Sequence, residues 1–174
     1  MLCELSLGGR TFGVRRAVAT DVPALAALYG ADPLSASRGD SAEGDLTDYE
    51  RAFAAIDADP HQLLVAVDAP DAGAPGASTV ATLQMTFLPG LARRGAWRAE
   101  LEAVHVAASQ RGRGLGAALI GWAVDEARRR GCALVQLTSS TSRTDAHRFY
   151  ERLGFTASHV GFKLALEQTP GAAR

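Results

Sequence analysis

The sequence predicts an α+β fold with one mixed sheet and helices on both of its faces. Some segments alternate apolar and polar residues, as strands do, whereas others repeat apolar residues three or four positions apart, as helices do. Stretches rich in glycine, proline and aspartate separate these segments. The 174 residues suffice for one domain with a substantial core. We expect an N-terminal extension over residues 1–11, a single domain over 12–166 and a flexible tail over 167–174.

The first expected elements are a strand and two helices. Phe12–Ala17 reads as the strand. Thr20 or Asp21 then caps a helix that runs through Tyr29, with a proline tolerated in its first turn. A polar loop leads to a second helix over Leu46–Asp57, where apolar residues recur at spacings of three and four.

Three strands are expected next. Leu63–Val67 and Thr79–Phe87 are predicted to be joined by a flexible hairpin loop, because residues 68–78 are rich in alanine, glycine and proline. Pro89–Gly95 interrupts the pattern, and Trp97–Val106 resumes it as a long strand.

A glycine-rich loop separates this strand from a longer helix. The helix begins near Leu115 and presents one apolar face. It ends in three arginines followed by Gly131, a combination that favours a helix C-terminus. Cys132–Thr138 is apolar enough to be a central strand of the sheet.

The C-terminal part is expected to hold a short helix and two strands. Ser142 or Thr144 caps the helix, which runs to Arg152. Phe155–Ala157 and Val160–Leu166 are predicted to be the final strands.

Composition and charge exclude several classes of protein. The net charge of −1 argues against nucleic-acid binding through the overall field. No stretch reaches the roughly 18 continuous apolar residues of a membrane span, and the first residues lack a signal-peptide pattern. Cys3 and Cys132 are too few for a disulfide framework or a zinc site. We therefore expect a soluble, cytoplasmic protein with no metal and no nucleic-acid or membrane partner.

The stretch Gln110–Ala117 carries the strongest functional signal. Its three glycines and two arginines lie between a strand and a helix, so its backbone can approach an anion at the helix N-terminus. A nucleoside triphosphate loop requires a lysine that is absent here. Gly112, Gly114 and Ala117 partly match a dinucleotide fingerprint, but the acidic residue expected after the next strand is missing, because residues 137–140 read Leu-Thr-Ser-Ser.

Two motifs resemble the GNAT superfamily of N-acetyltransferases. The family's Arg/Gln-x-x-Gly-x-Gly/Ala pattern, between a strand and a helix, is matched by Arg111, Gly114 and Gly116. Its Ala-x-x-x-Tyr-x-x-x-Gly-Phe pattern is matched by Ala146, Tyr150, Gly154 and Phe155. The resemblance spans roughly residues 12–166 and implies a central mixed, mostly antiparallel sheet with helices on both faces.

The resemblance implies acetyl-CoA as co-substrate. The backbone amides of the glycine loop would hold its pyrophosphate, two arginines would add charge, and the edge of the preceding strand would pair with the pantetheine arm. The cofactor-binding residues implied in this way are Val104, Val106, Arg111, Gly112, Arg113, Gly114, Leu115, Gly116 and Ala117. The family tends to have asparagine where this chain has Arg143, so the cofactor contact of that amide is not expected here, and a CoA phosphate or the acceptor is the alternative partner of Arg143.

The implied reaction is direct attack of an amine on the acetyl thioester, with release of the CoA thiol. It needs a neutral amine, a polarised carbonyl and a proton for the sulfur. Tyr150 is the expected acid, as the matching tyrosine often is in this family. Glu102 is the expected base, directly or through water, and Glu100 has the same parity on the strand. His105 is expected on the opposite face, and His147 lies on the helix that carries Tyr150.

The expected acceptor is a primary amine of a small molecule or of a peptide. A different reading is a non-catalytic module of the same fold that senses acyl-CoA without turning it over. Homodimers are common in the family, and the sequence leaves the oligomeric state open.

Overall fold

The chain folds into two compact units, Met1–Leu137 and Thr138–Arg174. The computed structural model describes residues 1–37, 39–41, 43–70 and 79–166. Residues 71–78 of the expected hairpin loop and the whole of the expected tail, 167–174, lie outside the described residues. No helix within the described ranges is long and apolar enough to cross a membrane.

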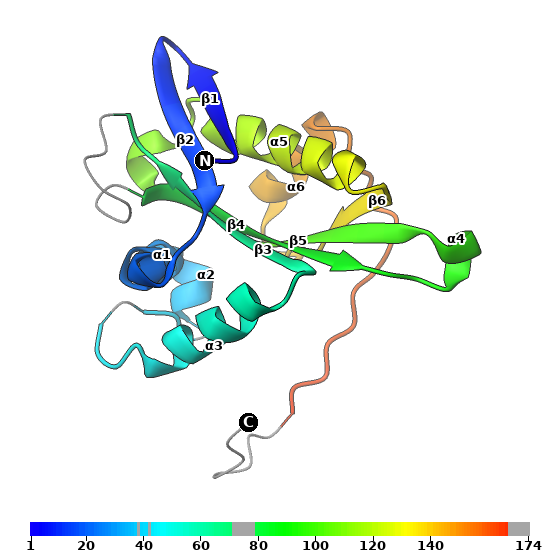
Figure 1. The fold of residues 1–174 in the computed structure, drawn as a ribbon, viewed down its shortest axis with the longest axis horizontal. Coiled ribbons are helices and arrows are strands. Elements are labelled where there is room, and N and C mark those ends of the chain that lie inside the picture. Colours follow the sequence, from blue (N-terminus) through cyan, green and yellow to red (C-terminus); the bar gives the residue numbers. More distant parts are fainter. Residues whose placement is uncertain (38, 42, 71–78, 167–174) are drawn as a thin grey trace. The chain divides into compact units, whose positions relative to one another are not determined.

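The first unit is built on a six-stranded sheet whose strands lie in chain order, from β1 to β6 (Figure 1). Neighbouring strands run antiparallel except for β5 and β6, which are parallel and are joined through a helix. The strands are β1 (Cys3–Leu7), β2 (Arg10–Arg16), β3 (Gln62–Asp68), β4 (Thr79–Leu88), β5 (Trp97–Val106) and β6 (Cys132–Leu137). The sheet is therefore mixed and mostly antiparallel, which confirms the predicted fold class.

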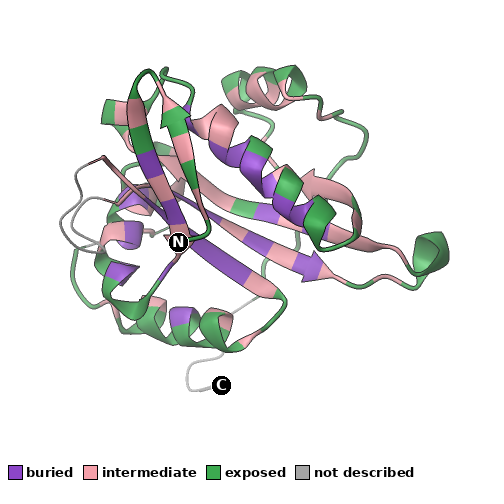
Figure 2. Ribbon diagram, turned by 45° about the horizontal axis from the view of Figure 1, so that its top comes forward, coloured by how far each residue is buried: buried purple, intermediate pink, exposed green. Residues whose placement is uncertain are grey.

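Helices cover both faces of this sheet. The helix α5 packs against β4, β5 and β6 on one face, whereas α1 and α3 lie on the other (Figure 1). Figure 2 shows buried residues concentrated in the central strands and on the side of α5 that faces them. The helical segments of this unit are η1 (Ala19–Asp21), α1 (Val22–Gly30), α2 (Pro33–Ala36), α3 (Thr47–Ala58), α4 (Ala92–Gly95), η2 (Ala108–Gln110) and α5 (Leu115–Arg129).

Alternation along the strands gives the two faces of the sheet different neighbours. Leu64 and Ala66 of β3 pack with Leu25 of α1 and Phe53 of α3, and they define the α1/α3 face. The residues that alternate with Leu64 and Ala66 along β3 point to the opposite side of the sheet, the α5 face. Those apolar residues of β3 are Leu63, Val65 and Val67, each at most 1% exposed. The central strands are thus buried on both sides.

A bulge in β5 changes which side chains share a face. Gln84 of β4 pairs with Glu102, and Thr82 pairs with His105, so two residues of β5 stand opposite one residue of β4. Ala103 lies within the bulge and has a φ of 49°. The bulge shifts the alternation by one position and places His105 on the α1/α3 face together with Glu102. The prediction that His105 lies on the opposite face was therefore wrong.

The N-terminal strand β1 lies in the region expected to be an extension. It pairs with β2 through a tight turn at Gly8 and Gly9, whose φ angles of 56° and 75° suit glycine. The signal was readable in the sequence, because Cys3, Leu5 and Leu7 alternate directly before the Gly-Gly pair.

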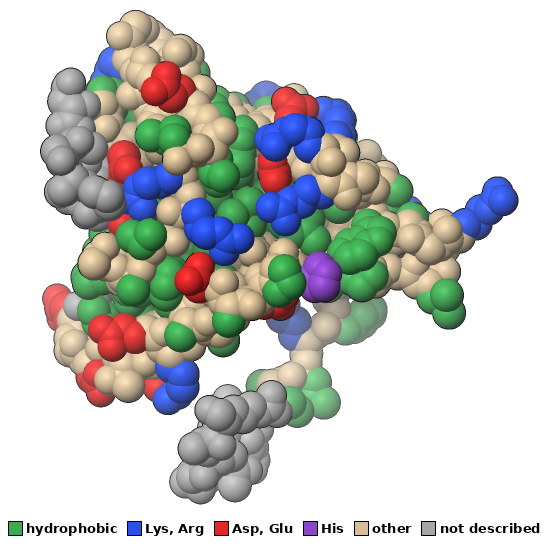
Figure 3. Space-filling model, in the orientation of Figure 1, with side chains coloured by type: hydrophobic (Ala, Val, Ile, Leu, Met, Phe, Trp, Pro, Cys, Tyr) green, Lys and Arg blue, Asp and Glu red, His purple; other side chains and the backbone are tan. Residues whose placement is uncertain are grey.

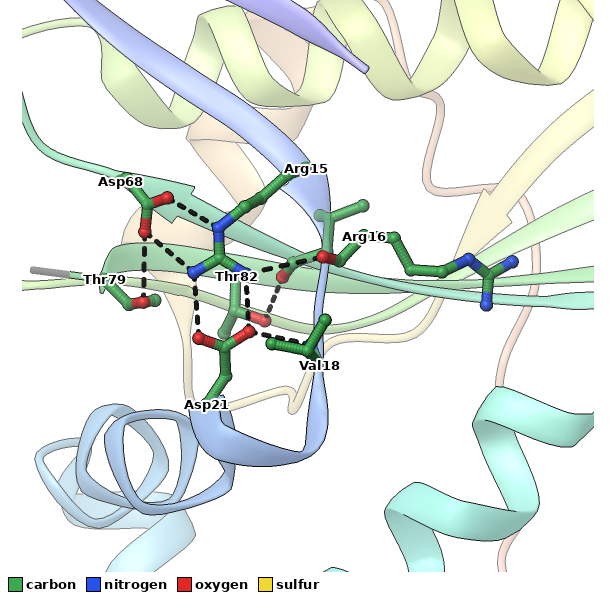
Figure 4. Close-up of polar contacts among 8 residues, drawn as sticks. Arg15, Arg16, Val18, Asp21, Asp68, Thr79 and Thr82 are labelled. Carbon is green, nitrogen blue, oxygen red and sulfur yellow. Dashed lines mark hydrogen bonds and ion pairs between the residues drawn. The ribbon is translucent and has the colours of Figure 1, made fainter. Parts of the chain in front are cut away.

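A buried ion-pair network ties the start of α1 to the sheet (Figure 4). Two guanidinium nitrogens of Arg15 donate to the carboxylate of Asp21 at 2.6 and 2.8 Å. Two donate to Asp68 at the end of β3, at 2.6 and 3.0 Å. Asp21 is fully buried and also accepts from the backbone N of Val18 at 2.8 Å. This network joins β2, β3 and the turn that leads into α1.

Two expectations about the last third of the chain were wrong. β6 lies at the end of the strand order and not in its centre. Residues 155–166, where two final strands were expected, form no regular secondary structure. Val160, Phe162 and Leu164 alternate as in a strand, yet they are 79–93% exposed. Alternation indicates a preference for the strand conformation, but a strand also needs a neighbouring edge to pair with. The described part of the second unit contains the helix α6 (Thr144–Arg152), as expected.

Candidate functional site

The glycine loop before α5 leaves backbone donors free at a helix start. Gly112 and Gly114 have φ angles of 71° and 86°, and Gly114 is the N-cap residue of α5. The amide of Ala118 donates to the carbonyl of Gly114 at 3.0 Å. The amides of residues 115–117 have no acceptor one turn earlier within the helix, and the first turn contains no acidic residue. These amides and the positive end of the helix dipole fit an anion.

Side-chain hydrogen bonds of two arginines hold this loop in place. Nε of Arg111 donates to the carbonyl oxygen of Val106 at 2.9 Å and so ties the loop to the end of β5. Nη1 of Arg10, on β2, donates to Oε1 of Gln110 at 3.1 Å. Arg113 is exposed in the loop. Of the two arginines expected near phosphate, Arg111 therefore has a structural partner, whereas Arg113 faces solvent.

Next to this loop, the edge of β5 has no strand partner among the described residues of the first unit. β6 pairs with β5 only as far as Leu101, which stands opposite Leu137. Glu102–Val106 continue the strand with no β6 partner among the described residues. An open strand edge presents backbone N–H and C=O groups to an extended chain. Backbone groups of the edge that carries Val104 and Val106 can therefore pair with a ligand that has amide groups, while the carbonyl oxygen of Val106 already accepts from Arg111.

The carboxylates expected near the reacting amine lie on the α1/α3 face. Glu102 is exposed, and half-buried Glu100 accepts from Nε2 of Gln136 at 3.3 Å. The ring of His105 makes an edge contact with Tyr29, with ring centroids 5.1 Å apart. The predicted base thus occupies an accessible position beside the open strand edge.

Amides and a hydroxyl that no sequence motif singled out share this face. Gln62 on β3 and Gln84 and Thr86 on β4 lie in register with Glu100 and Glu102 on β5. The polar residues of β4 alternate with apolar ones in the sequence, so the signal was present. Their meaning depends on which strands pair, and that is not a local property.

The side chains around Tyr150 are aromatic. Tyr150 lies in α6, is half-buried, and contacts the rings of Phe149 and Phe155 at centroid distances of 5.1 and 5.8 Å. Burial raises the pKa of Tyr150, and the positive charge of Arg143 opposes that shift. The phenol is therefore neutral at physiological pH, as a proton donor must be.

The rest of the second motif shapes the end of α6. Gly154 has a φ of 89° and terminates the helix, and the amide of Phe155 donates to the carbonyl of Tyr150 at 3.1 Å. Nε2 of His147 lies 2.8 Å from the carbonyl oxygen of Ser140, which gives His147 a structural partner in the preceding loop.

The first unit brings together the glycine loop, the strand edge and Glu102, whereas Tyr150 belongs to the second unit. Basic side chains also project at the tip of the β4–β5 hairpin, where α4 carries Arg93 and Arg94 (Figure 3). No group of three or more His, Cys, Asp or Glu side chains within the described ranges could hold a metal ion.

Comparisons with known proteins agree with this geometry. The sequence matches the profile of the acetyltransferase (GNAT) family over residues 25–155. The aminoalkylphosphonate N-acetyltransferase of Salmonella typhimurium (strain LT2) is 41% identical over 70 residues, which cover 40% of this chain and 46% of that protein. The chain spans less than half the length of the curated relatives it matches.

Solved structures extend the similarity over most of the chain. A protein of Bacillus halodurans C-125 described as a transcriptional regulator has a TM-score of 0.81 at 38% identity, over 89% of this chain and 99% of that one. A Trypanosoma brucei acetyltransferase has a TM-score of 0.70 at 25% identity, over 89% and 99%. Since the family profile also covers well over half of the sequence, the chain belongs to the acetyltransferase (GNAT) family.

Proposed function

We propose that this protein transfers the acetyl group of acetyl-CoA directly to a primary amine of a small molecule. The observation that carries the proposal is the open edge of β5 over Glu102–Val106, directly before a loop and helix start that fit an anion. An extended chain with amide groups and a diphosphate at one end matches both features. The family uses acetyl-CoA, and membership of it supports acyltransferase activity.

In this proposal the backbone does most of the cofactor binding. The amides of Gly112–Ala117, which include those of Gly114, Leu115 and Gly116, would hold the diphosphate. The backbone groups of Val104 and Val106 would pair with the pantetheine arm. Arg113 would add positive charge. The hydrogen bond of Arg111 to the strand supports a role in positioning the loop.

Glu102 is proposed to accept a proton from the acceptor ammonium, directly or through one water. A primary amine with a pKa near 10.4 is mostly protonated at pH 7, and its neutral form costs about 4.6 kcal/mol. The neutral nitrogen then attacks the thioester carbon, the new C–N bond forms, the nitrogen loses its second proton to solvent, and the C–S bond breaks. Holding the two reactants in register contributes much of the roughly 7–11 kcal/mol available from proximity.

Tyr150 is proposed to give its proton to the departing sulfur and to regain one from solvent. A phenol near pKa 10 is a weaker acid than a thiol near 8.5, so the transfer is uphill by about 2 kcal/mol. The raised pKa of Tyr150 makes this step slightly harder while keeping the donor protonated. The contribution of Tyr150 is therefore expected to be moderate.

A small-molecule acceptor is supported by the similar Salmonella typhimurium protein, which is named for acetylating aminoalkylphosphonates. A second candidate is a non-catalytic acyl-CoA sensor, which the name of the similar Bacillus halodurans transcriptional regulator favours. Whether it is an enzyme or a sensor, we place this protein in the cytoplasm. Size-exclusion chromatography with light scattering would distinguish a monomer from a homodimer.

One experiment separates the enzyme from the sensor. The purified chain is titrated with acetyl-CoA by calorimetry and then incubated with acetyl-CoA and a panel of amines, among them 2-aminoethylphosphonate, ethanolamine, putrescine and a lysine-containing peptide. Release of CoA thiol together with an acetyl mass shift on one amine supports the enzyme. Tight acetyl-CoA binding with no thiol release from any amine would favour the sensor.

A further inference from the structure

A row of polar side chains crosses the α1/α3 face of the sheet from β3 to β6. The members of the row, placed by strand register, are Gln62, Gln84, Thr86, Glu100, Glu102 and Gln136. At the same level the α5 face is apolar, where Leu83, Met85 and Leu101 are at most 2% exposed. The row therefore lies outside the core, on the face that carries the proposed base.

Gln62 fixes the orientation of the Gln84 amide. Oε1 of Gln62 accepts from Nε2 of Gln84 at 3.0 Å and from Oγ1 of Thr86 at 2.9 Å, so both of its lone pairs are in use. Because the amide nitrogen of Gln84 donates to Gln62, the side-chain carbonyl oxygen of Gln84 remains available to a ligand as a hydrogen-bond acceptor. That oxygen has no hydrogen-bond partner in the part of the chain that the structure describes.

Further acceptor atoms lie along the row beside Gln84. Glu102 pairs with Gln84 across the strands, and residues paired in this way have Cβ atoms about 5 Å apart. Further along the row, Gln136 donates its amide nitrogen to Glu100 and so also keeps its carbonyl oxygen for a ligand. Basic residues also lie on this face: Arg15 is held by Asp21 and Asp68, and Nη1 of Arg98 lies 3.6 Å from the position that a Cβ on Gly90 would take.

From this arrangement we infer that Oε1 of Gln84 and the carboxylate of Glu102 bind the ammonium group of the acceptor, with Gln62 as the positioning residue that orients Gln84. The inference rests on the proposed acetyl transfer and names its acceptor class. A primary ammonium has three donors and no acceptor, which matches the two acceptors that Gln84 and Glu102 offer side by side. Its hydrogen bonds are charge-assisted and stronger than those of a neutral hydroxyl. The site therefore selects a protonated amine over an alcohol of the same length.

The test uses the full chain, ¹⁵N-labelled, with n-butylammonium as the cationic probe and n-butanol as its neutral counterpart. The backbone amide of Glu102 and the side-chain amides of Gln62 and Gln84 report binding by NMR. We expect n-butylammonium to shift these signals and n-butanol to leave them in place. Gln62→Leu should weaken the Kd for n-butylammonium about tenfold, the effect of losing one oriented hydrogen bond, with the Kd for acetyl-CoA unchanged.

Two further variants separate orientation from a general structural role. Gln62→Glu keeps oxygen acceptors for both neighbours and should retain the wild-type Kd or improve it. Thr86→Val removes the other hydrogen bond to the same oxygen and should leave the Kd for n-butylammonium unchanged. Should Gln62→Leu fail to fold, Gln84→Leu removes the proposed ligand atom, Oε1 of Gln84, directly. Equal Kd values in wild type and Gln62→Leu, or an equal loss in Thr86→Val, would overturn the inference.

The test of ammonium binding can succeed or fail independently of the test of acetyl transfer. Ammonium-specific binding that depends on Gln62, without CoA release from any amine, supports the inference and contradicts the proposed enzyme. If an amine is acetylated, Gln62→Leu should raise the KM for that amine about tenfold and leave kcat and the KM for acetyl-CoA near wild type. Active enzyme with an unchanged amine KM in Gln62→Leu would overturn the inference alone.

Discussion

Glu102 and His105 lie on the same face of the sheet, although three positions along a regular strand would put them on opposite faces. The cause is the bulge at Ala103, whose φ of 49° is the left-handed conformation that costs an L-residue about 1–2 kcal/mol. The bulge lies where β5 has lost β6 as a neighbour. It therefore shapes both the open strand edge and the charged face next to it.

Changing Ala103 should alter stability in opposite directions, depending on the new side chain. Ala103→Gly should raise the free energy of unfolding by up to about 1 kcal/mol, because glycine adopts this φ without a Cβ clash. Ala103→Val should lower it by about 1 kcal/mol or more, since a β-branched residue fits this conformation poorly. Urea denaturation measures both. Equal stabilities of the two variants would show that the bulge is not strained.

Removing the hydroxyl of Tyr150 should slow the reaction without loosening the fold. Tyr150→Phe should lower kcat by about 10²-fold, within the usual range for a general acid. It should leave the acetyl-CoA Kd unchanged, because the ring contacts with Phe149 and Phe155 remain. Tyr49→Phe is the matched control, as its hydroxyl contacts Ser41 in the first unit, and it should keep wild-type kcat. Wild-type turnover in Tyr150→Phe would assign the residue to packing.

Two glycines of the same helix region should respond differently to alanine. Gly114 has a φ of 86° at the N-cap of α5, so Gly114→Ala should destabilise the protein by about 1 kcal/mol. It should also weaken acetyl-CoA binding, because the loop amides shift. An added Cβ on Gly121, inside α5, meets no atom within 4 Å, so Gly121→Ala should stabilise by about 0.5–1 kcal/mol. Calorimetry and urea denaturation together test this pair, and equal acetyl-CoA affinities would contradict the proposed anion site.

Breaking the buried pair of Arg15 and Asp21 should be among the most damaging substitutions. Asp21→Asn removes the charge from a fully buried side chain that holds Arg15 and the backbone of Val18, so a loss of about 3–5 kcal/mol is expected. Asp68→Asn should cost less, because the side chain of Asp68 is partly exposed. Urea denaturation of both variants gives the order, and the reverse order would contradict the central role of Asp21.

Stability should fall in strong alkali partly because of one tyrosine. Burial raises the pKa of Tyr29 to about 12, a shift that the hydrogen bond with Thr82 opposes and the charge of Asp40 supports. The unfolded chain loses this proton near pH 10. The contribution of the Tyr29 proton to the free energy of unfolding is therefore complete below about pH 10. It disappears as the pH rises to 12, a loss of about 2–3 kcal/mol. Tyr29→Phe should lack this component, so a wild-type slope of stability against pH in that variant would refute it.

Local signals predicted most of the regular elements. The helix expected over Leu46–Asp57 is α3, Thr47–Ala58, because apolar spacing is a local property. Trp97–Val106 was predicted with the bounds that β5 has. The bulge at Ala103 was not predicted, because no glycine marks it and because pairing with β4 decides it. The position of β6 at the edge of the sheet likewise depends on the strand order, which the periodicity of the sequence does not determine.

The candidate site also contains parts that local sequence predicts and parts that depend on strand pairing. The conformation of the glycine loop was predictable, since Gly112 and Gly114 have positive φ angles that few other residues adopt. The polar row was missed, because Gln62 and Glu102 come together only through the register of three strands. Arg111 was assigned to phosphate, and its hydrogen bond to Val106 can be seen only once the loop has folded back on the strand.

The alternation of β3, β4 and β5 separates two sets of side chains that could otherwise constrain each other. Residues on the α5 face, such as Leu83 and Leu101, build the interior, whereas Gln84 and Glu102 occupy the reverse side of the same strands. Substitutions in the polar row leave the packing beneath α5 intact. The polar row can therefore change without a change in the scaffold, and selection can act on the two sets of side chains independently.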